Sequence, residues 1–82
     1  MERRIAVIGI VVEDRLRAAP LVNEVLSQHG EIIVGRMGIP YNRQRNLSVI
    51  ALIVDGTTDE LGAMTGKLGN IRGVRVKTAV AL

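Results

Sequence analysis

The run from Gly62 to Thr78, GAMTGKLGNIRGVRVKT, combines glycines with cationic side chains, which are the residue types that bind phosphate. A P-loop needs the spacing G-x-x-x-x-G-K-S/T between a strand and a helix. Here only three residues separate Gly62 from Gly66, and Leu68 stands where the hydroxyl is needed. The segment also has a helical pattern, so its amides would already be hydrogen-bonded. The spacing disfavours a phosphate loop.

A structural role explains these glycines better. Gly62, Gly66 and Gly69 fall at positions i, i+4 and i+7, on one face of the predicted helix. Each glycine costs about 1 kcal/mol of helix propensity relative to alanine. We therefore expect a smooth helical face that lies close against a neighbour.

Other residues that could do chemistry are few. The chain has no cysteine, and its one histidine, His29, is predicted to end a helix. Ser27 and Ser48 lie in no nucleophile motif, and the adjacent acids Glu13 and Asp14 are explained by capping at a helix start. We predict no catalytic residue, no metal site and no cofactor, and hence a protein that is not an enzyme.

The composition indicates one small domain spanning residues 1–82. Hydrophobic residues make up 48% of the chain, which suggests that some apolar surface is buried against a partner. The apolar run Ile5–Val12 ends in acidic residues and is too short for a membrane span, which takes about 20 residues. Together with the absence of cysteine, this indicates a cytoplasmic protein without a membrane segment.

The hydrophobic pattern predicts four strands and two helices in the order β-α-β-β-α-β. The first and third strands, Ile5–Val12 and Leu47–Val54, are apolar on both faces and are predicted to be central. The outer strands are predicted at 31–41 and 73–82. This pattern predicts an α+β, ferredoxin-like fold, with a four-stranded antiparallel sheet and two helices on one face.

The sequence defines the start of the second helix more clearly than the start of the first. Thr57 and Glu60 have the spacing of a capping box. Asp14 is a candidate N-cap for the first helix and Gly30 a candidate residue just after its end. Pro20 would then lie inside the helix and forfeit a backbone hydrogen bond, so a later start near residue 19 remains open.

The sheet face without helices is expected to be apolar, because the central strands are apolar on both sides. An exposed apolar face of that size predicts self-association, sheet to sheet or edge to edge. The alternative is a nucleic-acid-binding protein that uses a basic sheet edge. Its candidate residues are Arg36, Arg43, Arg45, Arg72, Arg75 and Lys77. Against it, the sheet lacks the aromatic residues on which related folds stack bases.

Four runs, GIVVEDR, VNEVL, GRMGIPY and TGKLGNIRGVRVKT, resemble the small proteins described as iron-only hydrogenase system regulators. The resemblance covers essentially the whole chain. It implies an ACT-like domain, similar in fold to the C-terminal domain of the nickel-responsive repressor. It also implies a homodimer or homotetramer that regulates transcription through a bound small effector or a partner protein.

The resemblance further implies a site. ACT-like domains bind effectors near the loop between the first strand and the first helix, at a subunit interface. The matching residues here are Val12, Glu13, Asp14 and Arg15, with Arg36 and Tyr41 of the second strand added across the interface. The acids would favour an amine and the arginines an acid group, so an amino acid would suit both.

Two departures limit the resemblance. The nickel-responsive domain uses several histidines and a cysteine as ligands, whereas this chain offers only His29, so nickel sensing is not expected. No DNA-binding segment is expected before the first predicted strand. Regulation of transcription would then need a DNA-binding partner protein or an assembled basic surface.

Overall fold

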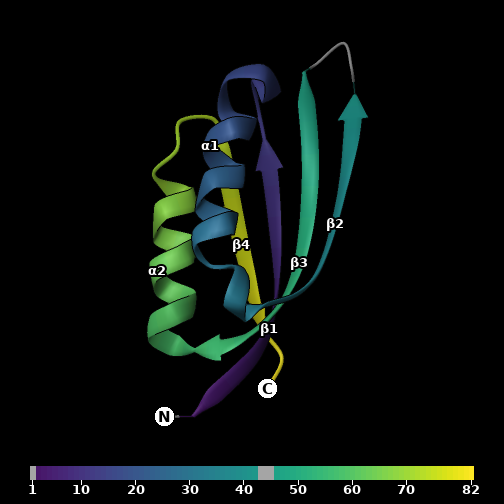
Figure 1. The fold of residues 1–82 in the computed structure, drawn as a ribbon. Coiled ribbons are helices and arrows are strands. Elements are labelled where there is room, and N and C mark those ends of the chain that lie inside the picture. The colour runs from purple at the N-terminus through teal and green to yellow at the C-terminus, as the bar shows by residue number, and fades with distance from the viewer. Residues whose placement is uncertain (1, 43–45) are drawn as a thin grey trace.

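The computed structural model describes residues 2–42 and 46–82, and residues 40–42 by their backbone alone. The chain forms β1 (Arg3–Val12), α1 (Arg15–Gln28), a short 3-10 helix η1 (Gly30–Ile32), β2 (Ile33–Asn42), β3 (Leu47–Thr57), α2 (Thr58–Gly69) and β4 (Val74–Val80) (Figure 1). This is the predicted element order, with η1 added between α1 and β2.

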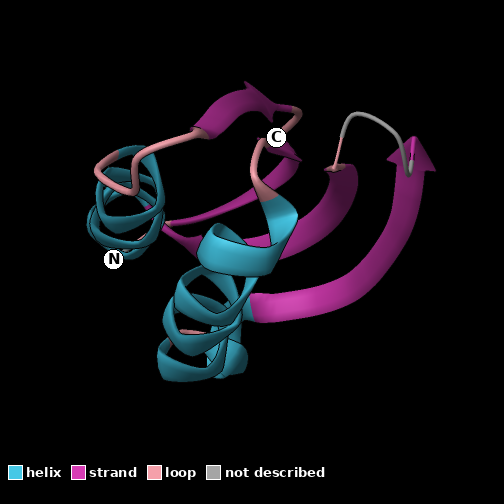
Figure 2. Cartoon of the chain, turned by 90° about the horizontal axis from the view of Figure 1, so that it is seen from above, coloured by secondary structure: helices cyan, strands magenta, loops and turns pink. Residues whose placement is uncertain are grey.

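The strands form one antiparallel sheet in the order β2-β3-β1-β4. The predicted central strands are therefore the observed ones, and they pair without interruption from Arg3 opposite Thr57 to Val12 opposite Ser48. Both helices lie on the same side of the curved sheet (Figure 2). The structure confirms the ferredoxin-like, ACT-like topology.

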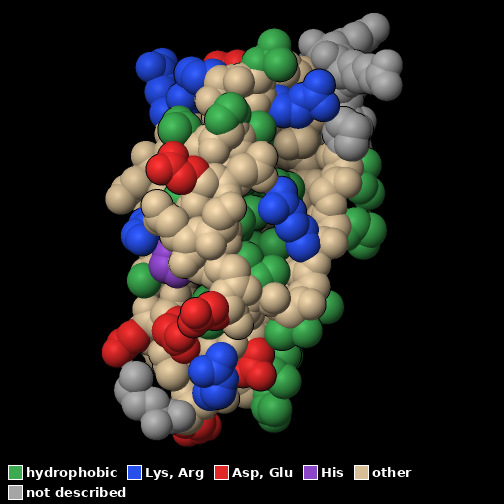
Figure 3. Space-filling view, in the orientation of Figure 1, with side chains coloured by type: hydrophobic (Ala, Val, Ile, Leu, Met, Phe, Trp, Pro, Cys, Tyr) green, Lys and Arg blue, Asp and Glu red, His purple; other side chains and the backbone are tan. Residues whose placement is uncertain are grey.

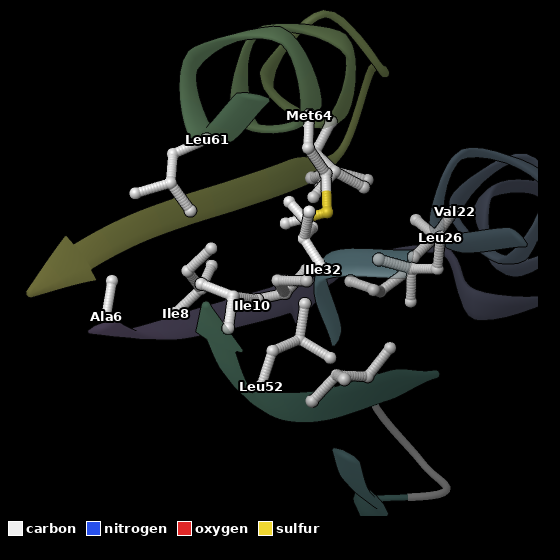
Figure 4. Close-up of a cluster of buried hydrophobic side chains, with 14 of the residues drawn as sticks. Ala6, Ile8, Ile10, Val22, Leu26, Ile32, Leu52, Leu61 and Met64 are labelled. Atoms are coloured by element: carbon white, nitrogen blue, oxygen red, sulfur yellow. The ribbon is translucent and has the colours of Figure 1, made fainter. Parts of the chain in front are cut away.

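The core fills the space between the sheet and the helices. Alternate residues of β1 and β3 point toward the helices, because side chains alternate between the faces of a strand. The buried set comprises Ala6, Ile8, Ile10 and Val12 of β1, Ile50, Leu52 and Val54 of β3, Val74 of β4, Ile32 of η1, and Ala18, Val22, Leu26, Leu61, Met64 and Leu68 of the two α-helices. Figure 4 shows many of these aliphatic side chains converging from both layers.

The opposite sheet face is open and apolar, as predicted. Val7 is 46% exposed and Met37 is 62% exposed, and Ile5, Ile39 and Ile53 are similarly exposed. Hydrophobic side chains gather along the right-hand margin of Figure 3, where β2 and β3 lie. No element of the described chain covers this face.

Helix α1 begins at Arg15, the earlier of the two starts that the sequence left open, and Pro20 lies inside it. Asp14 occupies the N-cap position but makes no side-chain cap bond, because its backbone is left-handed, with φ 53°. The prediction of a capping carboxylate there is wrong. Gly30 follows the C-cap His29 as predicted, and it opens η1.

Helix α2 has the predicted capping box. The Glu60 backbone N–H donates to Thr57 Oγ1 at 3.2 Å, and the Thr57 N–H donates to Glu60 Oε1 at 2.8 Å. That second bond stabilises the carboxylate and lowers the pKa of Glu60. The glycine-rich run from Gly62 to Thr78 therefore forms the end of α2, a turn and the first part of β4.

Within the described residues, no helix has the length and apolar character needed to span a bilayer.

Candidate effector site

The loop between β1 and α1 is held from two sides. The Glu13 backbone N–H donates to the carbonyl of Gly73 at 2.7 Å, and the Arg15 N–H donates to the carbonyl of Asn46 at 2.9 Å. Gly73 belongs to the turn before β4, whereas Asn46 directly precedes β3. The loop is thus hydrogen-bonded to the segments that lead into β3 and β4, and these backbone bonds fix where helix α1 starts.

Both predicted carboxylates already have cationic partners in the chain. Glu13 Oε1 lies 3.4 Å from Arg75 Nε, and Asp14 Oδ2 lies 3.1 Å from Arg17 Nε. Asn46 Nδ2 donates to the other oxygen of Asp14 at 3.2 Å. These pairs are exposed, so each adds little stability. A ligand amine would nonetheless have to compete with an arginine for either acid.

A cleft of about 190 Å³ lies between α1 and the strands β2 and β3. It is lined by Arg15, Ala19, Asn23, Arg36, Gly38, Ile39, Ser48 and Ile50. Figure 3 shows Lys and Arg side chains over the channel between α1 and β2. The cleft is smaller than a typical drug-sized pocket, which exceeds about 300 Å³. Its volume suits a small metabolite or one end of a larger molecule.

Arg36 reaches this cleft because of its register. It stands opposite Leu52, a fully buried residue on the helix-facing side of β3. Its Nη2 donates to Asn23 Oδ1 of α1 at 2.7 Å. A guanidinium carries five N–H donors in a planar fork, so this bond orients Arg36 while leaving donors that can bind a carboxylate.

The structure brings two of the predicted site residues together and separates the others. Arg15 and Arg36 line one cleft within a single chain, so Arg36 needs no second subunit to reach it. Val12 is fully buried in the core. Glu13 and Asp14 have the partners given above. The Tyr41 side chain lies outside the described residues.

Asn23 and Ala19 also line the cleft, and neither was among the predicted site residues. Arg15, Ala19 and Asn23 are spaced at i, i+4 and i+8, so they lie on one face of a helix. That spacing could have identified Asn23 once the helix start at Arg15 was known. Because Pro20 left the start of the helix open, this spacing could not be used to predict Asn23.

The six basic residues considered for nucleic acid do not gather on one described edge. Arg36 lies on β2, whereas Arg75 and Lys77 lie on β4, and these are the two opposite outer strands of the sheet. Arg75 is also paired with Glu13. Arg43 and Arg45 fall outside the described residues.

His29 has the predicted place at the end of α1, where its backbone N–H donates to the carbonyls of Val25 and Leu26. Its Nε2 atom is buried and lacks a hydrogen-bond partner in the described structure. Burial, followed by the nearby charge of Lys67, lowers the pKa of His29. Among the described residues, no three metal-ligating side chains lie together.

Comparison with known proteins gives one sequence family and several similar structures. Residues 4–78 match the TM1266-like family, described as iron-only hydrogenase system regulators. The uncharacterized protein TM1266 from Thermotoga maritima is 44% identical, with a TM-score of 0.93 over 99% of this chain and 100% of that one. No curated protein sequence matches the chain.

More distant structures share the fold. The ACT domain from the GTP pyrophosphokinase of Chlorobium tepidum is 24% identical, with a TM-score of 0.76 over 95% of this chain and 100% of that one. CPII, a nitrogen regulatory PII-like protein from Thiomonas intermedia K12, is 12% identical, with a TM-score of 0.53 over 99% of this chain and 94% of that one. By its sequence match and its ACT-like fold, the chain belongs to the TM1266-like family of iron-only hydrogenase system regulators.

Proposed function

We propose that this protein is a cytoplasmic regulatory module that binds a small acidic effector, assembles with copies of itself and acts on transcription through a DNA-binding partner protein. The regulated system would be that of an iron-only hydrogenase, as the family description indicates. The observation that carries the effector proposal is the pairing of Arg15 and Arg36 in one cleft.

The cleft favours binding over catalysis. Its lining contains two arginines, an asparagine and a serine, but no histidine, aspartate or glutamate that could act as a general base. Ser48 therefore has no activating partner in the lining. This composition supports a ligand site and gives no support to an enzyme.

The effector class follows from the charge of the cleft. A carboxylate placed between the two guanidinium groups would receive charge-assisted hydrogen bonds. An amino acid remains a suitable effector, since its carboxylate would face the arginines. Its ammonium would remain in solvent or compete with Arg17 for Asp14. The arginines make the acid group the part that is recognised.

Self-assembly is supported by the open sheet face. A contiguous apolar surface on two central strands and β2 is characteristic of an interface. A second copy offers the same apolar residues, so a two-fold arrangement of face against face would bury both surfaces at once. We propose this sheet face as the main interface of the oligomer.

The effector proposal is tested by calorimetric titration of the purified protein with individual amino acids and small dicarboxylic acids. At least one acid should bind the wild type, and Arg36→Gln should weaken its binding about tenfold or more, since a hydrogen bond between charged groups contributes about 1.5–3 kcal/mol. Arg75→Gln is the matched control, because Arg75 lies outside the cleft.

An equal loss in both variants, or no binding of any acid, would contradict the cleft proposal. The nucleic-acid alternative is tested in parallel by titration with duplex DNA at two salt concentrations. Binding that falls steeply with salt, as released counterions require, would support that alternative.

A further inference from the structure

A second groove runs between α2 and β4, on the other β-α-β unit from the effector cleft. Two adjoining hollows of about 720 and 440 Å³ form it, and they share Gly62, Thr65 and Thr78. Thr78 therefore lies where the two hollows meet. Figure 1 shows α2 beside β4, at the end of the sheet opposite β2.

The wall of this groove that α2 forms contains three glycines, which have no side chains. A Cβ atom added at Gly62, Gly66 or Gly69 would meet nothing within 4 Å in the chain. None of the three needs a left-handed backbone, since Gly73 is the one glycine with positive φ among the described residues. The expected close neighbour is therefore absent within the chain. These glycines leave space that the described chain does not fill.

The strand wall of the groove is an available sheet edge. β4 pairs with β1 in continuous register from Val74 to Val80, and its other side has no strand neighbour. The opposite edge, β2, has register shifts at both ends and contains Pro40, which lacks an N–H donor. β4 is thus the more regular of the two edges and the better suited to pair with another strand.

We propose that β4 and this groove form a second self-assembly surface, on which β4 of another copy pairs antiparallel about a two-fold axis at Thr78. Three registers show why the axis lies there. An axis at Lys77 would set two lysines opposite each other, and an axis at Val76 would set Arg75 opposite Lys77. Like charges directly opposite destabilise a strand pair.

The axis at Thr78 takes the like charges out of direct opposition. It sets Lys77 opposite Ala79 and Val76 opposite Val80 of the second copy. Val76 and Val80 lie on the helix-facing row of β4, opposite Ile10 and Ala6 of β1. Val80 is 56% exposed in the single chain. In the pair, these valines of the second copy enter the space beside the glycines of α2.

This surface is separate from the open sheet face and from the effector cleft. Two different two-fold contacts on one chain generate a closed tetramer when their axes cross at right angles, whereas either contact alone generates a dimer. The choice between dimer and tetramer, which the sequence left open, would then depend on the β4 edge.

The register is tested with a single cysteine in this cysteine-free chain. Thr78→Cys places one thiol on the axis, where two copies bring their Cβ atoms together, so mild oxidation should give a covalent dimer. Ser27→Cys, on the exposed surface of α1, is the control. The axial variant should cross-link at least tenfold faster. Equal rates in the two variants would overturn the proposed register.

The groove is tested by sedimentation of two folded variants. Gly66→Leu fills the groove and should halve the mass of the assembly, whereas Ala63→Leu adds the same side chain on the exposed side of α2 and should leave the mass unchanged. An unchanged mass for Gly66→Leu would overturn the proposal. So would a different protein that is bound in the native mass spectrum of the wild type and absent from that of Gly66→Leu.

Disrupting one of the two surfaces should leave the other intact. In Val7→Asp, which disrupts the open sheet face, the Thr78→Cys cross-link should persist at the same rate. Loss of the cross-link in that background would show that β4 pairing depends on the sheet face and would overturn the claim of a second, separate surface.

Discussion

On the central strands β1 and β3, the two faces of the sheet are built from the same kinds of residue and differ in what covers them. On β1, Ile8 is fully buried whereas its neighbour Val7 is 46% exposed. On β3, Leu52 and Ile53 show the same contrast. Right-handed crossovers bring both helices to one face, so topology decides which set is covered within the chain. An uncovered face that is apolar on both central strands indicates a cover that comes from outside the described chain.

The largest expected effect is a difference in stability between alanine variants of two neighbouring residues, one on each face of the sheet. Ile8→Ala should lower the free energy of unfolding by about 2–5 kcal/mol, because it leaves a cavity in a packed core. Val7→Ala should cost about 0.5 kcal/mol or less at protein concentrations where the oligomer is dissociated. Urea denaturation of both variants at low concentration measures the difference.

The same experiment at high protein concentration sharpens the comparison. Val7→Ala should then lose stability relative to the wild type, since the oligomer stabilises the folded chain by mass action. A cost at Val7 that does not vary with concentration would mean that its face has no partner.

A smaller effect is expected where the chain passes from β3 to the covering helix α2. Thr57→Ala removes the hydroxyl that accepts from the Glu60 N–H, and it should cost about 1 kcal/mol of stability. Thr58→Ala, one residue further and exposed, is the control and should be close to neutral. If both variants unfold at the same urea concentration, the capping box does not anchor the helix layer.

The smallest effect concerns pH and again involves the helix layer alone. Burial lowers the pKa of His29 in the folded chain below its ordinary value of 6.5, so the unfolded chain binds the proton more readily. Stability should therefore be full above about pH 6.5 and fall as the pH drops from there through the folded pKa.

His29→Gln should remove this part of the pH dependence without changing the mass of the oligomer. Thermal unfolding of both proteins between neutral and mildly acidic pH measures it. A pH profile that is identical in the variant and the wild type would show that another group is responsible.

Much of the fold was predictable because the relevant signals are local. The two-sided apolar runs identified β1 and β3 as central, and the Thr57–Glu60 spacing identified the start of α2. Asp14 was misjudged because its left-handed backbone and its contact with Asn46, 32 positions away in sequence, form only in the folded chain. The short 3-10 helix η1 was likewise not predicted, because three residues are too few to show a hydrophobic periodicity.

The site was predictable only in part. Arg15 and Arg36 could be named from the resemblance, but their meeting in one cleft depends on strand register and on where α1 begins. The separation of Glu13 from that cleft depends on its pairing with Arg75, which is 62 positions away in sequence. The open groove along β4 could not be predicted, since glycine spacing does not tell whether a neighbour is present.

The central claim, that a second copy covers the open sheet face, is tested most directly by native mass spectrometry of wild type and Val7→Asp purified without added ligand. The wild type should be a dimer or tetramer. Val7→Asp should form a smaller assembly, with unchanged circular dichroism. A wild type that is monomeric at micromolar concentration, or a Val7→Asp variant with the full mass, would contradict it.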